Sequence, residues 1–89
     1  MADEVSELKK HVKEKKLIVG TKATLKRLRM GKLSAVFMSS NCPASVKEDV
    51  AHYSTLAGTR VVQLAIPNEE LGTVCKKFFS VSVAGVPRG

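Results

Sequence analysis

Aromatic residues are scarce in this chain of 89 residues: they make up 4% of the sequence, and tryptophan is absent. A hydrophobic core must therefore be assembled from valine, leucine, isoleucine and alanine side chains. Hydrophobic residues still account for 44% of the sequence, which is close to the globular average, so disorder is not predicted. The short length predicts a single domain over residues 1–89.

Cysteine is also rare, because Cys42 and Cys75 are the two in the sequence. They do not form a Cys-x-x-Cys pair, and neither His11 nor His52 stands at a zinc-ligand spacing from them. In the absence of a secretory signal, this pattern is typical of reduced thiols in the cytosol. We therefore expect no structural metal and no cofactor.

Long apolar runs are missing as well. No stretch approaches the ~20 apolar residues that a helix needs to cross a bilayer. Residues 1–16 are charged throughout and do not resemble a signal peptide. We expect a cytoplasmic protein without a membrane partner.

Acidic residues are outnumbered, since 8 Asp and Glu stand against 15 Lys and Arg, and the formal net charge is +7. A surface with this charge attracts polyanions, of which nucleic acid is the commonest. The charge balance therefore favours a nucleic-acid-binding protein.

Short apolar runs alternate with segments of helical periodicity along the whole chain. The expected helices span residues 3–15, 21–30, 45–57 and 68–76, and the expected strands span residues 17–20, 34–38, 60–66 and 81–86. Helices that alternate with strands imply a sheet covered by helices. We predict an α/β fold, a three-layer α-β-α sandwich with a central mixed sheet of about four strands.

Helix ends are marked by familiar residues. Ser45 followed by Glu48 is a capping-box pattern, and Asn68 can cap the last helix through its side chain. Gly31 and Gly58 are natural C-terminal stops.

The first candidate binding segment runs from Gly20 into a predicted helix. Lys22 and Lys26 lie on one face of this helix at i,i+4 spacing. A lysine near a helix N-terminus is locally unfavourable, and a bound phosphate would reverse that penalty. The alternative is that both lysines are merely solvated. The candidate RNA-binding residues here are Gly20, Thr21, Lys22, Thr24, Lys26 and Arg27.

Enzymatic motifs are absent. A nucleotide-binding P-loop needs a glycine five residues before its Gly-Lys pair and a Ser or Thr after it. The pair Gly31-Lys32 meets neither condition, and no dinucleotide-binding glycine fingerprint occurs. Neither cysteine nor histidine has a partner that reads as a nucleophile or a base. We predict that the chain is not an enzyme and has no small-molecule substrate.

Three further features favour an RNA-binding surface: Asn41, Gly72 and the pair Phe78-Phe79. Asn41 is a loop amide that can read base edges. Gly72 lies inside a predicted helix at a cost of ~1 kcal/mol relative to alanine, which indicates a close approach by another backbone or a ligand.

The pair Phe78-Phe79 follows the basic Lys76-Lys77. One phenylalanine can enter the core, and an exposed one beside Lys77 can stack on an unpaired base. If Phe78 continues the core-facing side, Phe79 faces outward. The alternative is that both rings are buried.

These segments together resemble the family of archaeal and eukaryotic large-subunit ribosomal proteins numbered thirty, within a superfamily that binds kink-turn RNA. The resemblance covers about Val5 to Val86 and is carried by residues 20–32, Asn41 with Pro43, residues 47–49 with Tyr53, and residues 68–73. It implies a three-layer sandwich fold and a location in the ribosome. It also implies that the partner is ribosomal RNA with a kink-turn or an internal loop, and that neighbouring ribosomal proteins are further partners.

The resemblance also places individual residues. Lys22 and Ala23 stand where many superfamily members have Asn-Glu, and lysine at the first position is typical of this ribosomal branch. Asn41 matches a loop asparagine, and Phe79 matches an aromatic in an RNA-contacting loop. Lys76 stands where glycine is usual, and Ser80 stands where a basic residue can occur.

Two alternatives remain open. One is a kink-turn protein of a non-ribosomal ribonucleoprotein, although such proteins usually carry the Asn-Glu pair. The other is a protein–protein adaptor of the same fold, although adaptors tend toward acidic surfaces.

Overall fold

The computed structural model describes residues 2–14 and 17–87 of the chain. Helices and strands alternate along the described residues as the sequence predicts. In chain order the elements are α1 (Ala2–Lys13), β1 (Ile18–Val19), α2 (Thr21–Arg29), β2 (Leu33–Met38), α3 (Ala44–Ala57), β3 (Arg60–Gln63), α4 (Asn68–Val74) and β4 (Val83–Pro87).

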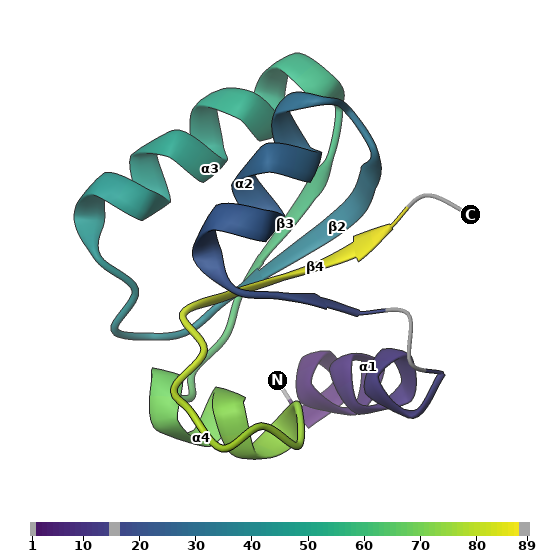
Figure 1. The fold of residues 1–89 in the computed structure, drawn as a ribbon, viewed down its shortest axis with the longest axis vertical. Helices are drawn as coiled ribbons and strands as arrows, with labels where there is room; N and C mark the ends of the chain where they lie inside the picture. Colours follow the sequence, from purple (N-terminus) through teal and green to yellow (C-terminus); the bar gives the residue numbers. More distant parts are fainter. Residues whose placement is uncertain (1, 15–16, 88–89) are drawn as a thin grey trace.

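The strands form one mixed sheet in the order β1-β4-β2-β3. Strand β4 is antiparallel to both of its neighbours, and β2 is parallel to β3. Helices α2 and α3 cover one face of the sheet, and α1 and α4 cover the other (Figure 1). The predicted three-layer α-β-α sandwich is confirmed.

A hydrophobic cluster fills each face of the sheet. Alternate residues of β2 point to opposite faces, so Phe37 packs on the α1 and α4 side and Val36 on the α2 and α3 side. Leu8 on α1 is fully buried in the first cluster, and Val12 packs against it. The side chain of Val5, which we expected on the same helix face, lies outside the described residues.

An ion pair fastens α1 to the edge strand β3. The guanidinium of Arg60 donates two hydrogen bonds to the Glu7 carboxylate, at 3.1 and 3.0 Å. This bonding, more than any other influence, holds the pKa of Glu7 below its usual value. Because both side chains are partly exposed, the pair contributes more to orienting α1 than to stability.

The predicted side-chain caps are wrong. Helix α3 begins one residue before Ser45, with Pro43 at the N-cap, and no side chain caps it. The Lys47 N–H donates to the Pro43 carbonyl at 3.0 Å, because the carbonyl of an N-cap residue accepts the first hydrogen bond of the helix. Asn68 is likewise the first residue of α4, after Pro67 at the N-cap.

The C-terminal ends of the helices agree better with the ends predicted from the sequence. Gly58 closes α3 in the left-handed region, at φ 66°, and Gly31 follows α2 at φ 69°. Helix α4 ends at Val74, two residues before the predicted end. Lys76 then takes a φ of 59°, a conformation that glycine tolerates far better than lysine does.

Candidate nucleic-acid interface

The direction of the strands brings the candidate segments to one edge of the sheet. Strands β1, β2 and β3 run the same way and β4 runs against them, so the ends of the first three meet the start of the fourth. We call this the loop edge. It comprises residues 19–22, 39–43, 64–68 and 75–82, and it lies at the left of the view in Figure 1. Helices α2, α3 and α4 all begin there.

Gly20 carries the chain from β1 into α2. Its φ of 110° is a conformation that other residues rarely adopt. Its N–H donates to the Val83 carbonyl at 3.2 Å, and its carbonyl accepts from the Thr24 N–H at 3.0 Å. These two bonds fix the start of α2 against the start of β4, beside the half-buried Thr21.

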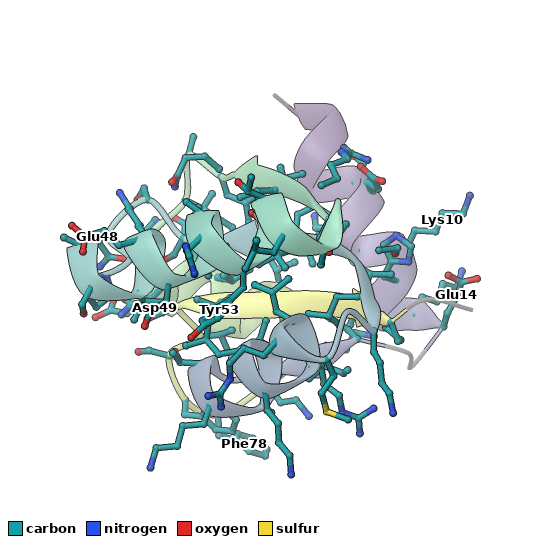
Figure 2. All side chains as sticks on the ribbon, turned by 90° about the horizontal axis from the view of Figure 1, so that it is seen from above. Lys10, Glu14, Glu48, Asp49, Tyr53 and Phe78 are labelled. Carbon is teal, nitrogen blue, oxygen red and sulfur yellow. The ribbon has the colours of Figure 1, made fainter. Side chains whose placement is uncertain are left out.

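Lys22 and Lys26 project from α2 as the i,i+4 spacing predicts, and both are exposed. They line a hollow of about 370 Å³ between α2 and α3, together with Leu25, Arg29, Asp49 and Tyr53. Figure 2 shows Asp49 and Tyr53 on α3 facing α2. The Arg29 guanidinium lies over the Tyr53 ring, 5.9 Å from its centroid.

Two other candidate residues of α2, Thr24 and Arg27, lie outside this hollow. Thr24 is fully buried, and its hydroxyl lies 3.5 Å from the Ile18 carbonyl oxygen. We therefore correct its assignment from an RNA contact to a core residue. Arg27 is exposed but does not line the hollow between α2 and α3.

Asn41 joins two loops of the edge. Its Oδ1 accepts from the Asn68 backbone N–H at 2.8 Å, and its Nδ2 donates to the Asn68 Oδ1 at 3.2 Å. The loop after β2 is thereby fastened to the start of α4. The Asn41 amide keeps one hydrogen and one lone pair for a ligand.

The loop from α4 to β4 wraps closely over its own helix. A Cβ atom built at Gly72 would overlap the Phe79 carbonyl oxygen and lie 3.4 Å from the Ser80 Cα. The Lys77 N–H donates to the Gly72 carbonyl at 2.9 Å, and the Val81 N–H donates to the Asn68 carbonyl at 3.0 Å. The close approach predicted from the mid-helix glycine is confirmed. Gly72 is buried, so it shapes the loop and is not itself a contact surface.

The prediction that one ring of Phe78-Phe79 is buried is wrong. Phe78 is fully exposed and Phe79 is 59% exposed. The chain folds back over α4 before it enters β4, and Val81, at 1% exposure, is the first residue after the phenylalanine pair to enter the core. Phe78 projects from the margin of the molecule in Figure 2.

A second hollow lies beside this pair, between α4 and the loop that follows it. It measures about 250 Å³ and is lined by Glu69, Thr73, Lys77, Phe78, Phe79 and Ser80. Two exposed rings beside an ammonium group can stack on unpaired bases while the lysine meets a phosphate.

The thiols do not contribute chemistry to this edge. Both cysteines are free and buried. Burial raises the pKa of Cys42, and it raises the pKa of Cys75 to about 11. Both thiols are therefore protonated at neutral pH. Among the described residues no group of three or more His, Cys, Asp or Glu could hold a metal ion, and no helix could span a membrane.

These features define a class: a small basic α-β-α domain that presents lysines, an asparagine and exposed phenylalanines along one sheet edge, as a nucleic-acid-binding domain does. The model of the ribosomal protein L7Ae/L30e/S12e/Gadd45 family matches residues 4–88. The chain belongs to this family, which confirms the resemblance drawn from the sequence and agrees with the prediction that the chain is not an enzyme.

Two curated relatives carry the same name, large ribosomal subunit protein eL30. The relative from Branchiostoma belcheri is 38% identical over 81 residues, which are 91% of this chain and 71% of the relative. The relative from Sulfolobus acidocaldarius is 38% identical over 80 residues, which are 90% of this chain and 77% of the relative.

Two solved structures share the fold at lower identity. A protein of unknown function from Bacillus halodurans is 20% identical, with a TM-score of 0.82 over 96% of this chain and 84% of its own. The 15.5kD RNA binding protein of Giardia lamblia is 21% identical, with a TM-score of 0.77 over 99% of this chain and 73% of its own.

Proposed function

We propose that this chain is a structural constituent of the large ribosomal subunit and that its loop edge binds ribosomal RNA. The RNA element is a kink-turn or an internal loop. Lys22 at the start of α2 and Lys26 one turn further along meet phosphates, and Phe78 and Phe79 stack on unpaired bases. Lys77 supplies a further cation between the rings and the body of the domain.

One observation carries this proposal: exposed lysines and two exposed phenylalanines gather at the sheet edge where the loops are fastened by backbone hydrogen bonds. A rigid platform of this kind loses little entropy when RNA binds. The curated relatives named large ribosomal subunit protein support the ribosome as the assembly. They favour it over a non-ribosomal ribonucleoprotein.

Crosslinking in cells tests the proposal directly. RNA attached to the protein would be sequenced after ultraviolet crosslinking, and the protein would be followed through a ribosome gradient. We expect mainly large-subunit ribosomal RNA, with crosslinks at the loop edge. Enrichment of small nuclear or nucleolar RNA would instead identify a non-ribosomal particle, and the absence of RNA would favour an adaptor.

Lys22→Ala is expected to weaken RNA binding by about 1–3 kcal/mol if its ammonium makes a charge-assisted bond to a phosphate. The free energy of unfolding should change little, because an exposed cation near a helix N-terminus does not stabilise the helix. Lys32→Ala is the matched control, since Lys32 is exposed and precedes β2 at the opposite edge of the sheet. Equal affinities of the two variants for RNA would mean that Lys22 is merely solvated and does not contact the RNA.

Salt should weaken binding steeply, because each lysine–phosphate contact releases a counterion. With Lys22, Lys26 and Lys77 engaged, log K against log salt is expected to fall with a slope of about −2 or steeper. Binding isotherms at several salt concentrations measure it. A flat plot would remove the electrostatic argument.

A further inference from the structure

A groove lies on the α1 side of the sheet, where the end of α1, strand β1 and the end of α4 meet. It measures about 450 Å³ and is lined by Val12, Lys13, Leu17, Val19, Cys75, Lys76 and Lys77. Its volume falls in the range of about 300–1,000 Å³ that is typical of small-molecule sites. Of the residues assigned to RNA above, Lys77 is the one that reaches it.

The groove combines an apolar floor with a cationic rim. Val12, Leu17 and Val19 are half-buried, and the Cys75 thiol is buried and neutral. The three lysines are exposed, and no acidic residue is among the described lining residues. An anion with an apolar or aromatic body fits this arrangement, because the body covers the floor while the charge meets the lysines.

Lys76 takes a strained conformation at the rim. Its φ of 59° lies in the left-handed region, which is unfavourable for a residue with a Cβ and nearly free of cost for glycine. Strained residues of this kind cluster at ligand-binding and switch sites. The chain therefore gives up stability at this position and gains an ammonium group beside the groove.

The groove adjoins the loop edge, because Cys75, Lys76 and Lys77 belong to both. Lys77 lines both this groove and the hollow that holds Phe78 and Phe79. An RNA strand that leaves the phenylalanine pair can therefore pass Lys77 and reach the apolar floor. A duplex is too wide to enter, whereas unpaired nucleotides are the part of an RNA that proteins accommodate singly.

We propose that this groove binds one unpaired nucleotide that extends from the RNA held at the loop edge. Its base or ribose covers Val12 and Leu17, and its phosphate lies between Lys13 and Lys76. This inference rests on the proposed function, since the loop edge must first hold the RNA.

The test compares a blunt kink-turn RNA with the same RNA extended by four single-stranded uridines, at each stem in turn. Fluorescence anisotropy gives the dissociation constant at one fixed salt concentration. The variants are Lys13→Ala and Lys76→Gly, with Lys32→Ala as the control for the lost charge. Thermal unfolding is measured on all of them.

For the unaltered chain, one extension is expected to tighten binding about fivefold or more. Lys13→Ala and Lys76→Gly should lose this gain, and Lys32→Ala should keep it. Lys76→Gly should also unfold at a higher temperature, since it removes the strain. Opposite changes in stability and affinity are not expected of a merely structural lysine.

Two results would overturn the inference. If neither extension tightens binding, or if both groove variants keep the full gain, the groove does not bind a nucleotide, while the loop edge remains the RNA-binding surface. If the unaltered chain does not bind the blunt RNA at all, the proposed function fails and takes this inference with it.

Discussion

Gly72→Ala is expected to destabilise the fold by about 2 kcal/mol and to lower the melting temperature by roughly 10 °C. The added Cβ would overlap the Phe79 carbonyl oxygen, which belongs to the backbone and cannot rotate away. The α4–β4 loop must then lift from the helix and strain the bond from the Lys77 N–H to the Gly72 carbonyl. This cost exceeds the gain of ~1 kcal/mol that alanine brings to a helix interior.

RNA binding should fall in the same variant, because the displaced loop carries Phe78 and Lys77. Thr73→Ala is the control for stability alone, since Thr73 is the next residue of α4 and is exposed, but it also lines the hollow beside Phe78 and Phe79. Its effect on unfolding is expected to stay within about 0.5 kcal/mol. Thermal and denaturant unfolding measure both variants. A Gly72→Ala protein as stable as the unaltered chain would mean that the loop does not rest on α4.

Phe78→Ala is expected to weaken RNA binding by about 1–3 kcal/mol, roughly 5- to 150-fold, and to leave the melting temperature unchanged. The fully exposed ring contributes nothing to the core, so its removal costs no packing. Its apolar surface is covered when a base stacks on it. Isotherms with a kink-turn RNA and thermal unfolding of the free protein measure the two quantities.

Two further variants sharpen this experiment. Phe78→Trp should retain most of the affinity, because the indole offers a stacking surface of its own. Leu56→Ala removes another exposed apolar side chain, at the far end of α3, and should change neither quantity. A loss of affinity with Leu56→Ala, or none with Phe78→Ala, would contradict the stacking role. Phe79→Ala is expected to affect both quantities, because that ring is only 59% exposed.

The phenylalanine pair shows where reasoning from the sequence stops. Alternation in an extended segment predicted one buried and one exposed ring, but the segment is not extended. Backbone bonds to Gly72 and Asn68 pull it over α4, and Val81 fills the core instead. Those partners lie up to thirteen residues away along the chain, so no local pattern indicates them.

Helix starts show the same limit on a smaller scale. Ser45 with Glu48 matched the capping-box spacing, yet α3 begins at Ala44, with Pro43 at the N-cap. Asn68 matched a cap residue, yet it begins α4 itself and receives the Asn41 side chain from another loop. The choice among neighbouring start residues depends on how each loop packs.

By itself, the sequence determined the class of fold, the position of each element to within a few residues, the basic character of the surface and the family. The fold class and the element positions depend on neighbouring residues, because hydrophobic periodicity and turn residues act locally. The charge follows from the composition, and the family follows from motifs distributed along the chain. The mid-helix glycine even predicted a close approach at Gly72, without naming the residue that approaches.

Only the tertiary structure decided which residues meet. The strand order β1-β4-β2-β3 places the last strand between the first and the second, which brings Gly20 against Val83. The same packing buries Thr24, exposes Phe78 and opens the groove beside Lys76. Such contacts join residues far apart in the chain. They depend on how whole elements pack, which the local pattern around each residue does not specify.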